Sequence, residues 1–352
     1  MKLFIPGPVT VAEENYREMC RPMIGHRSKE YAALHAEVVS KLQQLMYTKN
    51  RVFIFTSSST GIMEACARNL VAKKALVLAC GAFSERWHRI FQNNGKQADA
   101  VAVEWGKANK PDGLAERLAT GEYDVVAVVH NETSTGVMNP VKEIADVVRR
   151  YPDVLLCVDT VSSMGGVKIP VDEWGIDVCL FGTQKDLGLP PGLAFCAVSD
   201  RAMKRAESVP NRGEYFDFIN MDKYNQKNNT PATPAVSLLF AVNHQLARLL
   251  ARGLEKRYAE RLEMANYVRA WAKKNFDLYP EPGYESNTLT VIKNTRGINV
   301  GELNEKLKAQ GMMISNGYGK IKDVTFRIAH MAETTLADIK DLLERIDKIL
   351  GL

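Results

Sequence analysis

The chain has 352 residues, 46% of them hydrophobic and 25% charged, and this composition excludes fibrous and disordered proteins. Its 46 Lys and Arg residues against 41 Asp and Glu residues give a net charge of +5 without basic blocks, which argues against a nucleic-acid surface. No apolar run is long enough to cross a membrane, and Pro-Gly-Pro interrupts the N-terminus where a signal peptide would be apolar, so we expect a cytoplasmic protein.

The cysteines and histidines show no pattern typical of metal ligands. The six cysteines form no CxxC pair, and the six histidines form no HxxxH or HExxH pattern. Most cysteines lie in apolar surroundings and are expected to be reduced core residues. The sequence therefore predicts no metal site.

The N-terminal region begins with a segment that cannot be helical. Residues 1–10 contain Pro6-Gly7-Pro8 and are expected to form an extended arm. Farther on, His26 and Arg27 place two cationic donors before a helical pattern. They would suit a carboxylate or phosphate, but they could also be solvated residues at the start of a helix.

Two apolar strands with polar or aromatic turns come next. The strand at 52–55 is followed by Thr56-Ser57-Ser58-Ser59-Thr60-Gly61, which opens a helix at 62–70. Hydroxyl groups and free amides at a helix N-terminus favour a phosphate, whereas an ordinary N-cap needs one hydroxyl. The strand at 75–79 leads to a turn with Phe83 and Trp87, and Trp87 is expected to pack in the core.

The middle of the chain alternates strands and helices. A strand at 124–129 ends in the polar loop 130–136, and a helix at 141–150 leads to the strand at 154–158. A second apolar strand follows at 178–181. This alternation predicts a parallel sheet covered by helices on both faces, with ligands at the carboxyl ends of its strands.

Two ionisable residues lie at those strand ends. Asp159 closes the strand at 154–158, and Lys185 follows the strand at 178–181. Taken singly, Asp159 could cap a turn and Lys185 could lie on the surface. Together they suit catalysis with pyridoxal phosphate, in which a lysine amine condenses with the cofactor aldehyde and a carboxylate keeps the ring nitrogen protonated.

The C-terminal part is expected to form a second, smaller domain. The strand at 193–198 is predicted to be antiparallel or at an edge, and 200–228 to be irregular. A helical pattern from 235 to about 274 breaks near Gly253, and strands, a helix at 300–310 and a final helix at 336–350 follow. Arg327 interrupts an apolar strand, which is costly unless a carboxylate pairs with it. We expect an N-terminal arm at 1–15, a large domain at 16–250 and a small domain at 251–352.

Several segments resemble one known family, the class V aminotransferases. GTQKDLGLPPG resembles the family's lysine segment, VDTVSSMGG its cofactor-aspartate segment, and HNETSTG, NTPAT and FRIAHM three further motifs. These motifs appear in family order over nearly the whole chain. The resemblance implies an α/β fold, the fold type I of pyridoxal-phosphate-dependent transferases, with a mostly parallel seven-stranded sheet between helices and a small α+β C-terminal domain.

The resemblance also implies roles for single residues. Lys185 would bind pyridoxal 5'-phosphate and shuttle a proton, and Arg327 would bind the substrate α-carboxylate. Gly7, His26 and Arg27 would also lie at the substrate, His26 and Arg27 at its acidic end. Asn229 and Thr230 would reach the cofactor phosphate of a partner subunit, making the active unit a homodimer with composite sites. The other cofactor-binding residues would be Ser58, Ser59, Thr60, Phe83, Thr133, Asp159, Val161 and Gln184.

Three functions remain open at this point. The segment 316–331 looks most like enzymes that transfer an amino group from serine or alanine to glyoxylate or pyruvate. His26-Arg27 and the Asn-Glu-Thr and NTPxT motifs favour phosphoserine with 2-oxoglutarate instead, although Lys320-Ile321 stands where phosphoserine enzymes carry a His-Arg pair. A catalytically idle subunit with the same fold is the third. A cysteine desulfurase of the usual kind is excluded, because no cysteine follows Cys196.

Overall fold

A seven-stranded sheet organises the larger part of the molecule. The computed structural model describes all 352 residues. β10 is antiparallel to both of its neighbours, and the other six strands run parallel to one another. The strands lie in the order β2 (Arg51–Phe55), β10 (Ala194–Val198), β9 (Val178–Gly182), β8 (Leu155–Asp159), β5 (Val125–Val129), β3 (Lys74–Ala79) and β4 (Gln97–Ala102).

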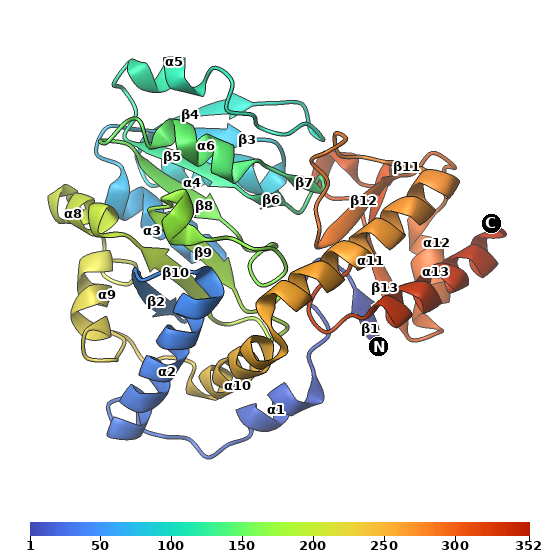
Figure 1. Cartoon of the computed structure of the whole chain (residues 1–352), viewed down its shortest axis with the longest axis horizontal. Coiled ribbons are helices and arrows are strands. Elements are labelled where there is room, and N and C mark those ends of the chain that lie inside the picture. Colours follow the sequence, from blue (N-terminus) through green and yellow to red (C-terminus); the bar gives the residue numbers. More distant parts are fainter.

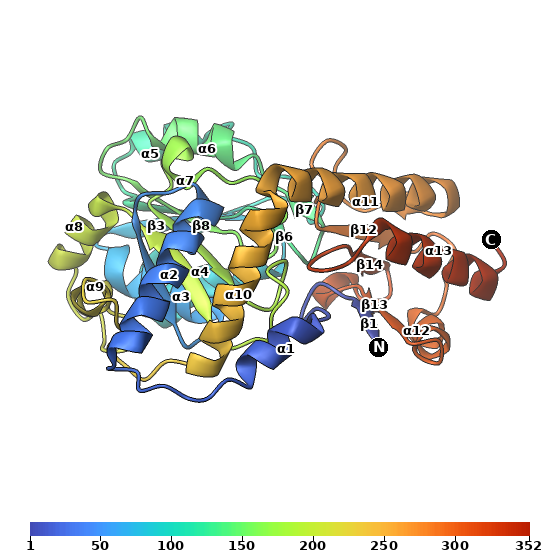
Figure 2. The ribbon, with the colours of Figure 1, turned by 60° about the horizontal axis from the view of Figure 1, so that its bottom comes forward.

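Helices cover both faces of this sheet, as Figures 1 and 2 show. Alternate strand residues point to opposite faces, so Val126 and Val128 join one hydrophobic cluster and Val125 and Ala127 join the other. The first cluster includes α2 (Lys29–Met46), α5 (Leu114–Ala119), α6 (Val141–Val148), α7 (Val171–Trp174) and α10 (Val236–Arg252). The second includes α3 (Ser59–Leu70), α4 (Ala82–Asn93), α8 (Asp200–Ser208) and α9 (Phe218–Asn225).

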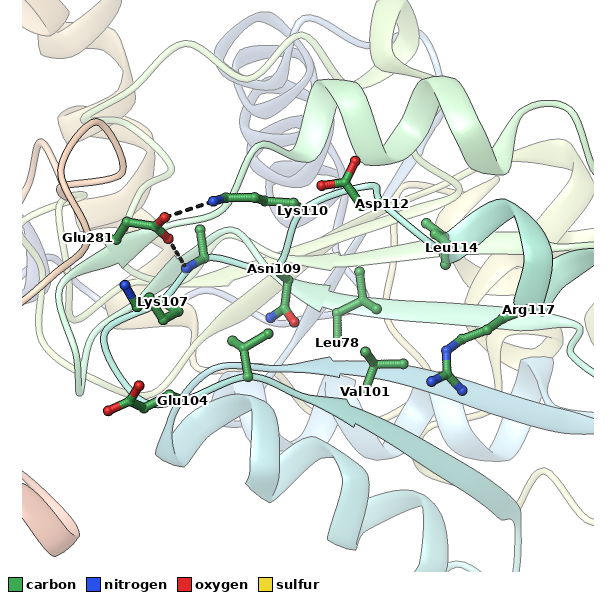
Figure 3. A pocket seen from close by; sticks show the side chains of 13 residues that line it. Leu78, Val101, Glu104, Lys107, Asn109, Lys110, Asp112, Leu114, Arg117 and Glu281 are labelled. Atoms are coloured by element: carbon green, nitrogen blue, oxygen red, sulfur yellow. Dashed lines mark hydrogen bonds and ion pairs between the residues drawn. The ribbon is translucent and has the colours of Figure 1, made fainter.

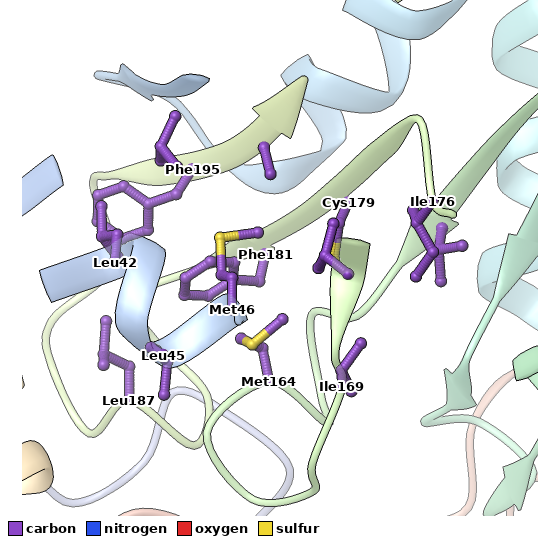
Figure 4. Packing of buried hydrophobic residues seen from close by; sticks show 14 of the residues in the cluster. Leu42, Leu45, Met46, Met164, Ile169, Ile176, Cys179, Phe181, Leu187 and Phe195 are labelled. Atoms are coloured by element: carbon purple, nitrogen blue, oxygen red, sulfur yellow. The ribbon is translucent and has the colours of Figure 1, made fainter. Parts of the chain in front are cut away.

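The first cluster includes part of the loop that follows β9 and carries Lys185, which we call the lysine loop. Figure 4 shows Leu42, Leu45 and Met46 of α2 against Phe181 and Phe195, whose ring centroids lie 5.2 Å apart. Leu187 from the loop after β9 belongs to the same cluster and is 1% exposed. This loop is therefore anchored to α2 by apolar packing.

A five-stranded sheet with helices on one face forms the second lobe. Its order is β1 (Lys2–Phe4), β13 (Met312–Asn316), β14 (Thr325–Ala329), β12 (Leu289–Lys293) and β11 (Asp277–Leu278). α11 (Leu254–Asn275), α12 (Val300–Lys308) and α13 (Leu336–Leu350) pack on it. Smaller elements are α1 (Glu13–Met19), which packs on α10, the hairpin β6 (Asn131–Glu132) and β7 (Val137–Met138), and a 3-10 helix at Gly319–Ile321.

The N-terminal segment is built into this second sheet. β1 pairs in parallel with β13, from Lys2 opposite Met312 to Phe4 opposite Ile314. Figures 1 and 2 both place the N-terminus beside β13, among the C-terminal residues. The sequence predicted an extended arm but not this pairing, because three residues carry too short a pattern to identify a strand partner.

The fold class expected from the sequence, a mostly parallel seven-stranded sheet between helices with a smaller α+β part, is confirmed. One local prediction was wrong, because the segment 200–228 is not irregular and contains α8 and α9. The strand expected to be antiparallel or at an edge, β10, is antiparallel and lies between β2 and β9. The domain boundaries at residues 15 and 250 stay predictions. None of the helices combines the length and apolar composition needed to span a bilayer.

The last helix offers a test of local stability. The Thr335 hydroxyl accepts from the Asp338 N–H at 3.3 Å, and Asp338 Oδ2 accepts from the Thr335 N–H at 2.9 Å, which closes a capping box on α13. We expect Thr335→Ala to lower the free energy of unfolding by about 1 kcal/mol. Urea denaturation measures this loss. Thr334→Ala is the matched control, because the Thr334 side chain caps nothing, and an equal loss in both variants would contradict the prediction.

Candidate active site at the carboxyl edge of the large sheet

The predicted cofactor-binding residues gather at one edge because β2, β3, β5, β8 and β9 run parallel. Each strand delivers its following loop to the same side. The residues brought there in this way are Ser58, Ser59 and Thr60 after β2, Phe83 after β3, Thr133 after β5, Asp159 and Val161 with β8, and Gln184 and Lys185 after β9.

The Lys185 residue as a whole is half-buried. Its amine is surrounded by protein atoms, and Nζ donates to the Pro6 carbonyl. Burial, together with the positive charge of Arg327, lowers the pKa of Lys185 to about 8, although Asp159 opposes the shift. The amine is therefore much easier to deprotonate than an exposed lysine, which suits a nucleophile or base.

Asp159 is 4% exposed, and burial raises its pKa to about 7. The Val161 N–H donates to Oδ1 at 2.7 Å and, like the charge of Lys185, opposes this rise. This N–H is the only hydrogen-bond donor that the chain supplies to the Asp159 carboxylate. A buried carboxylate with one donor can accept another from a bound group.

Gly7 brings the N-terminal arm against the lysine. Its φ of +97° favours glycine, and a Cβ at this position would lie 2.6 Å from Lys185 Cδ. The main chain of the arm thus comes close to the Lys185 side chain, and the role of Gly7 at the substrate stays a prediction. The sequence signal for it was the Pro-Gly-Pro string.

Arg327 is 7% exposed and has no carboxylate within 4 Å, so the alternative of a structural ion pair is wrong. Its Nε donates to the Asn316 carbonyl at 2.9 Å and its Nη1 to the Thr133 carbonyl at 3.4 Å. Burial lowers the pKa of Arg327 to about 10, yet the group stays cationic at neutral pH. A buried cation without an anionic partner fits an anionic ligand.

The turn that carries Phe83 is held by a residue that sequence reasoning did not single out. Glu132 is fully buried and accepts from the Ser84 N–H at 3.0 Å and from the Ser134 hydroxyl at 2.6 Å. Phe83 stacks on Tyr318 with centroids 5.4 Å apart, and Arg86 lies over the Phe83 ring. Tyr318 and Arg86 were also missed, because an aromatic residue or arginine in a loop or helix carries no local signal of a site.

The N-terminus of α3 has the features of an anion site. Ser58 takes the N-cap position, but its side chain makes no cap hydrogen bond. The Ser59 hydroxyl is buried and has no hydrogen-bond partner in the chain. An orphaned buried hydroxyl at a helix N-terminus fits a phosphate better than an ordinary cap.

Arg27, Asn229 and Thr230 form a separate group. Arg27 donates to the Asn229 side chain, to the Thr230 carbonyl at 2.6 Å and to the Pro231 carbonyl at 3.0 Å. None of them hydrogen-bonds to Lys185 or Arg327 within the chain, and half-buried His26 makes no hydrogen bond to either. Arg27 is held by the 229–231 loop, and its substrate-binding role stays a prediction.

One further sequence interpretation concerns the core. Trp87 is fully buried, and its Nε1 donates to the Met63 carbonyl at 3.2 Å, so the core-packing prediction is confirmed. A cavity of about 550 Å³ lies apart from the lysine, between the end of β4 and the segment that leads to α5 (Figure 3). Lys110 pairs there with Glu281 at 2.7 Å. None of the predicted site residues lines this cavity.

Comparison with known proteins agrees with this geometry. Residues 9–338 match the family described as aminotransferase class-V. The chain belongs to this family. It is 37% identical over 338 residues to an uncharacterized aminotransferase of Methanocaldococcus jannaschii, covering 94% of this chain and 87% of the relative. It is 34% identical to the L-aspartate–glyoxylate aminotransferase of Paracoccus denitrificans, covering 95% and 87%.

A solved structure gives the same assignment of fold. The alanine–glyoxylate aminotransferase of a Nostoc species superposes with a TM-score of 0.93 at 25% identity, covering 99% of this chain and 94% of the other. The class V aminotransferase has the fold type I of pyridoxal-phosphate-dependent transferases, as its motifs predicted. It is an enzyme of the transaminase class. The roles of single residues stay predictions.

The close approach of Gly7 to the lysine gives a test. We expect Gly7→Ala to lower kcat by at least about tenfold, because a Cβ would displace the Lys185 side chain. Steady-state transamination kinetics measure this. Gly95→Ala is the control, since Gly95 has a φ of +70° but open space around it. A similar loss of kcat in both variants would contradict the prediction, because backbone strain alone would then explain it.

Proposed function

We propose that this aminotransferase binds pyridoxal 5'-phosphate at Lys185 and moves the amino group of a small amino acid, serine or alanine, to a 2-oxo acid such as glyoxylate or pyruvate. The observation that carries the proposal is the buried, unpaired Arg327 beside the low-pKa amine of Lys185. An α-carboxylate has the charge and the two oxygens that a guanidinium binds best.

The residues at the sheet edge fit the cofactor. The N-terminus of α3 with Ser58, Ser59 and Thr60 would hold the phosphate, and the Asp159 carboxylate would accept from the protonated ring nitrogen. Phe83 and Val161 would pack on the ring, and Thr133 and Gln184 would supply polar contacts. When bound, the cofactor supplies an aldehyde for the amine and an electron-accepting ring.

Lys185 is then the group that moves protons. Its lowered pKa leaves a substantial neutral fraction near pH 8, so the amine can remove the proton at the substrate Cα and would deliver it to the aldehyde carbon of the bound cofactor. Arg327 holds the α-carboxylate while this happens, and the Asn316 and Thr133 carbonyls fix the guanidinium. Two successive half-reactions would give ping-pong kinetics.

The second subunit is part of the proposal. Asn229 and Thr230 lie in one loop that Arg27 binds and hydrogen-bond to neither Lys185 nor Arg327 of their own chain, and their NTPxT motif supports a contact with a partner's cofactor phosphate. We therefore propose a cytoplasmic homodimer with composite sites.

The other functions have weaker support. Phosphoserine requires a cationic pair for its phosphate, but Arg27 is already engaged by the 229–231 loop. An idle subunit would have no need of an arginine buried without a partner. The Paracoccus relative is named for aspartate, so aspartate belongs among the donors to be tested.

A spectroscopic donor screen tests the proposal. The purified protein with pyridoxal phosphate should absorb at about 400–430 nm, and Lys185→Ala should lose that band. Serine or alanine, with glyoxylate regenerating the band, should bleach it faster than phosphoserine or aspartate. A preference for phosphoserine or aspartate would overturn the substrate assignment, and an absent band would overturn the proposal as a whole.

The lowered pKa of Lys185 predicts a pH dependence. The neutral amine attacks the aldehyde, so cofactor uptake by the cofactor-free protein should accelerate by about tenfold per pH unit below about 8 and level off above it. Stopped-flow absorbance measures this rate. In Arg327→Met the plateau should begin at higher pH, because a charge that lowers the lysine pKa is gone. An unchanged profile in this variant would contradict the assignment.

A further inference from the structure

The residue after the lysine is a fully buried carboxylate held by two buried arginines. Asp186 is 0% exposed, and its Oδ1 accepts from Arg257 Nη2 at 3.1 Å, from Arg261 Nε at 3.1 Å and from the Ala332 N–H at 2.6 Å. Arg257 and Arg261 are 0% and 2% exposed and lie one turn apart on α11. We call Asp186, Arg257 and Arg261 the aspartate clamp.

The clamp joins three segments that are distant in sequence. Arg257 also donates to the Asp186 carbonyl at 2.6 Å and, through Nε, to the Gly165 carbonyl at 2.7 Å. Arg261 donates to the Ala332 carbonyl and, at 3.2 Å, to the Thr334 carbonyl. The arginine donors are therefore divided among the lysine loop, the loop after β8 and the turn after β14.

Each of these segments carries or follows a residue of the proposed site. The lysine loop carries Lys185, the loop after β8 follows Asp159, and the turn at 330–334 follows the strand that carries Arg327. Figure 2 shows α11 leaving the end of α10 and running along the second lobe. Its first two turns, which hold both arginines, thus lie where the two lobes meet.

The Asp186 side chain is closely packed. A Cβ added at Gly166 would collide with the Asp186 carboxylate, so this glycine makes room for it. On the other side of the loop, Leu187 packs against Leu45 in the first hydrophobic cluster. The loop is held by charge on one side and by apolar packing on the other, and its backbone cannot shift without breaking one of them.

We propose that Asp186 is a positioning residue, which with Arg257 and Arg261 fixes the Lys185 amine relative to the carboxylate-binding Arg327. The proposal rests on the proposed roles of Lys185 and Arg327. A lysine that moves a proton at the substrate Cα must be placed accurately relative to the group that holds the carboxylate. The two arginines bind the backbone of Asp186, next to Lys185, and of Ala332, in the turn after the strand that carries Arg327.

A simpler view is that the clamp only stabilises the fold, and a triple variant separates the two. Asp186→Asn, Arg257→Met and Arg261→Met together remove all three charges and leave no buried ion unpaired, so the protein is expected to fold. Removal of Asp186 alone would strand two buried cations. Arg261→Met alone keeps a matched pair and serves as the intermediate variant.

The expected result has a kinetic and a structural part. In the triple variant kcat should fall at least about tenfold, while KM for the amino donor changes by less than about threefold, because Arg327 still binds the carboxylate. Amide hydrogen exchange at 185–189 and 330–334, measured on the whole protein with and without pyridoxal phosphate, should accelerate in both segments. Arg261→Met should retain most of kcat.

The controls distinguish this proposal from failure of the proposed function. Arg205→Met removes an arginine from the buried Asp124 elsewhere in the large sheet and should leave kcat and the 330–334 exchange unchanged. Should the triple variant not fold, Gly166→Ala displaces the Asp186 carboxylate without changing a charge. Unchanged kcat and exchange in a folded clamp variant would overturn the positioning role. Loss of the absorbance band in the parent protein would instead overturn the proposed function.

Discussion

The structure depends on keeping three ionised side chains away from water at one edge of a sheet. Burial disfavours the charged forms of Lys185, Asp159 and Arg327, and each pKa is displaced toward the neutral form. Two are cations and one is an anion, so the site carries an excess of positive charge that its own side chains do not neutralise. Anionic ligands, such as a phosphate and an α-carboxylate, complete the charge balance.

A parallel sheet is the scaffold that makes such an edge possible. Helices cover both faces with clusters of 41 and 28 buried residues, so the strands themselves cannot move apart or tilt without opening a core. With both faces covered, polar groups gather at the carboxyl ends of the strands, where five loops converge. Because the sheet is rigid and the loops are short, the functional groups on these loops are held in fixed positions.

Much of this could be read from the sequence, and the failures have identifiable causes. β5, β8 and β9 are short apolar runs with polar residues at their ends, and this pattern identifies both a buried strand and a candidate site. β1 and the position of β10 were missed, since strand order depends on pairings that no local pattern encodes. The buried ion pairs of Asp186 were missed for a related reason. Its partners lie 71 and 75 positions away in the sequence, and a single aspartate in a loop is expected to lie on the surface.

Segments from both ends of the chain bring the second lobe to the site. β1 pairs with β13 and leads directly to Pro6 and Gly7, which touch Lys185, while β14 pairs with β13 and carries Arg327. A rigid displacement of the five-stranded sheet would therefore move the Pro6 carbonyl and the Arg327 guanidinium together. The lysine itself belongs to the seven-stranded sheet. Since the N-terminal arm and the carboxylate-binding strand belong to one body and the lysine to the other, the relative placement of the two lobes decides whether the site is complete.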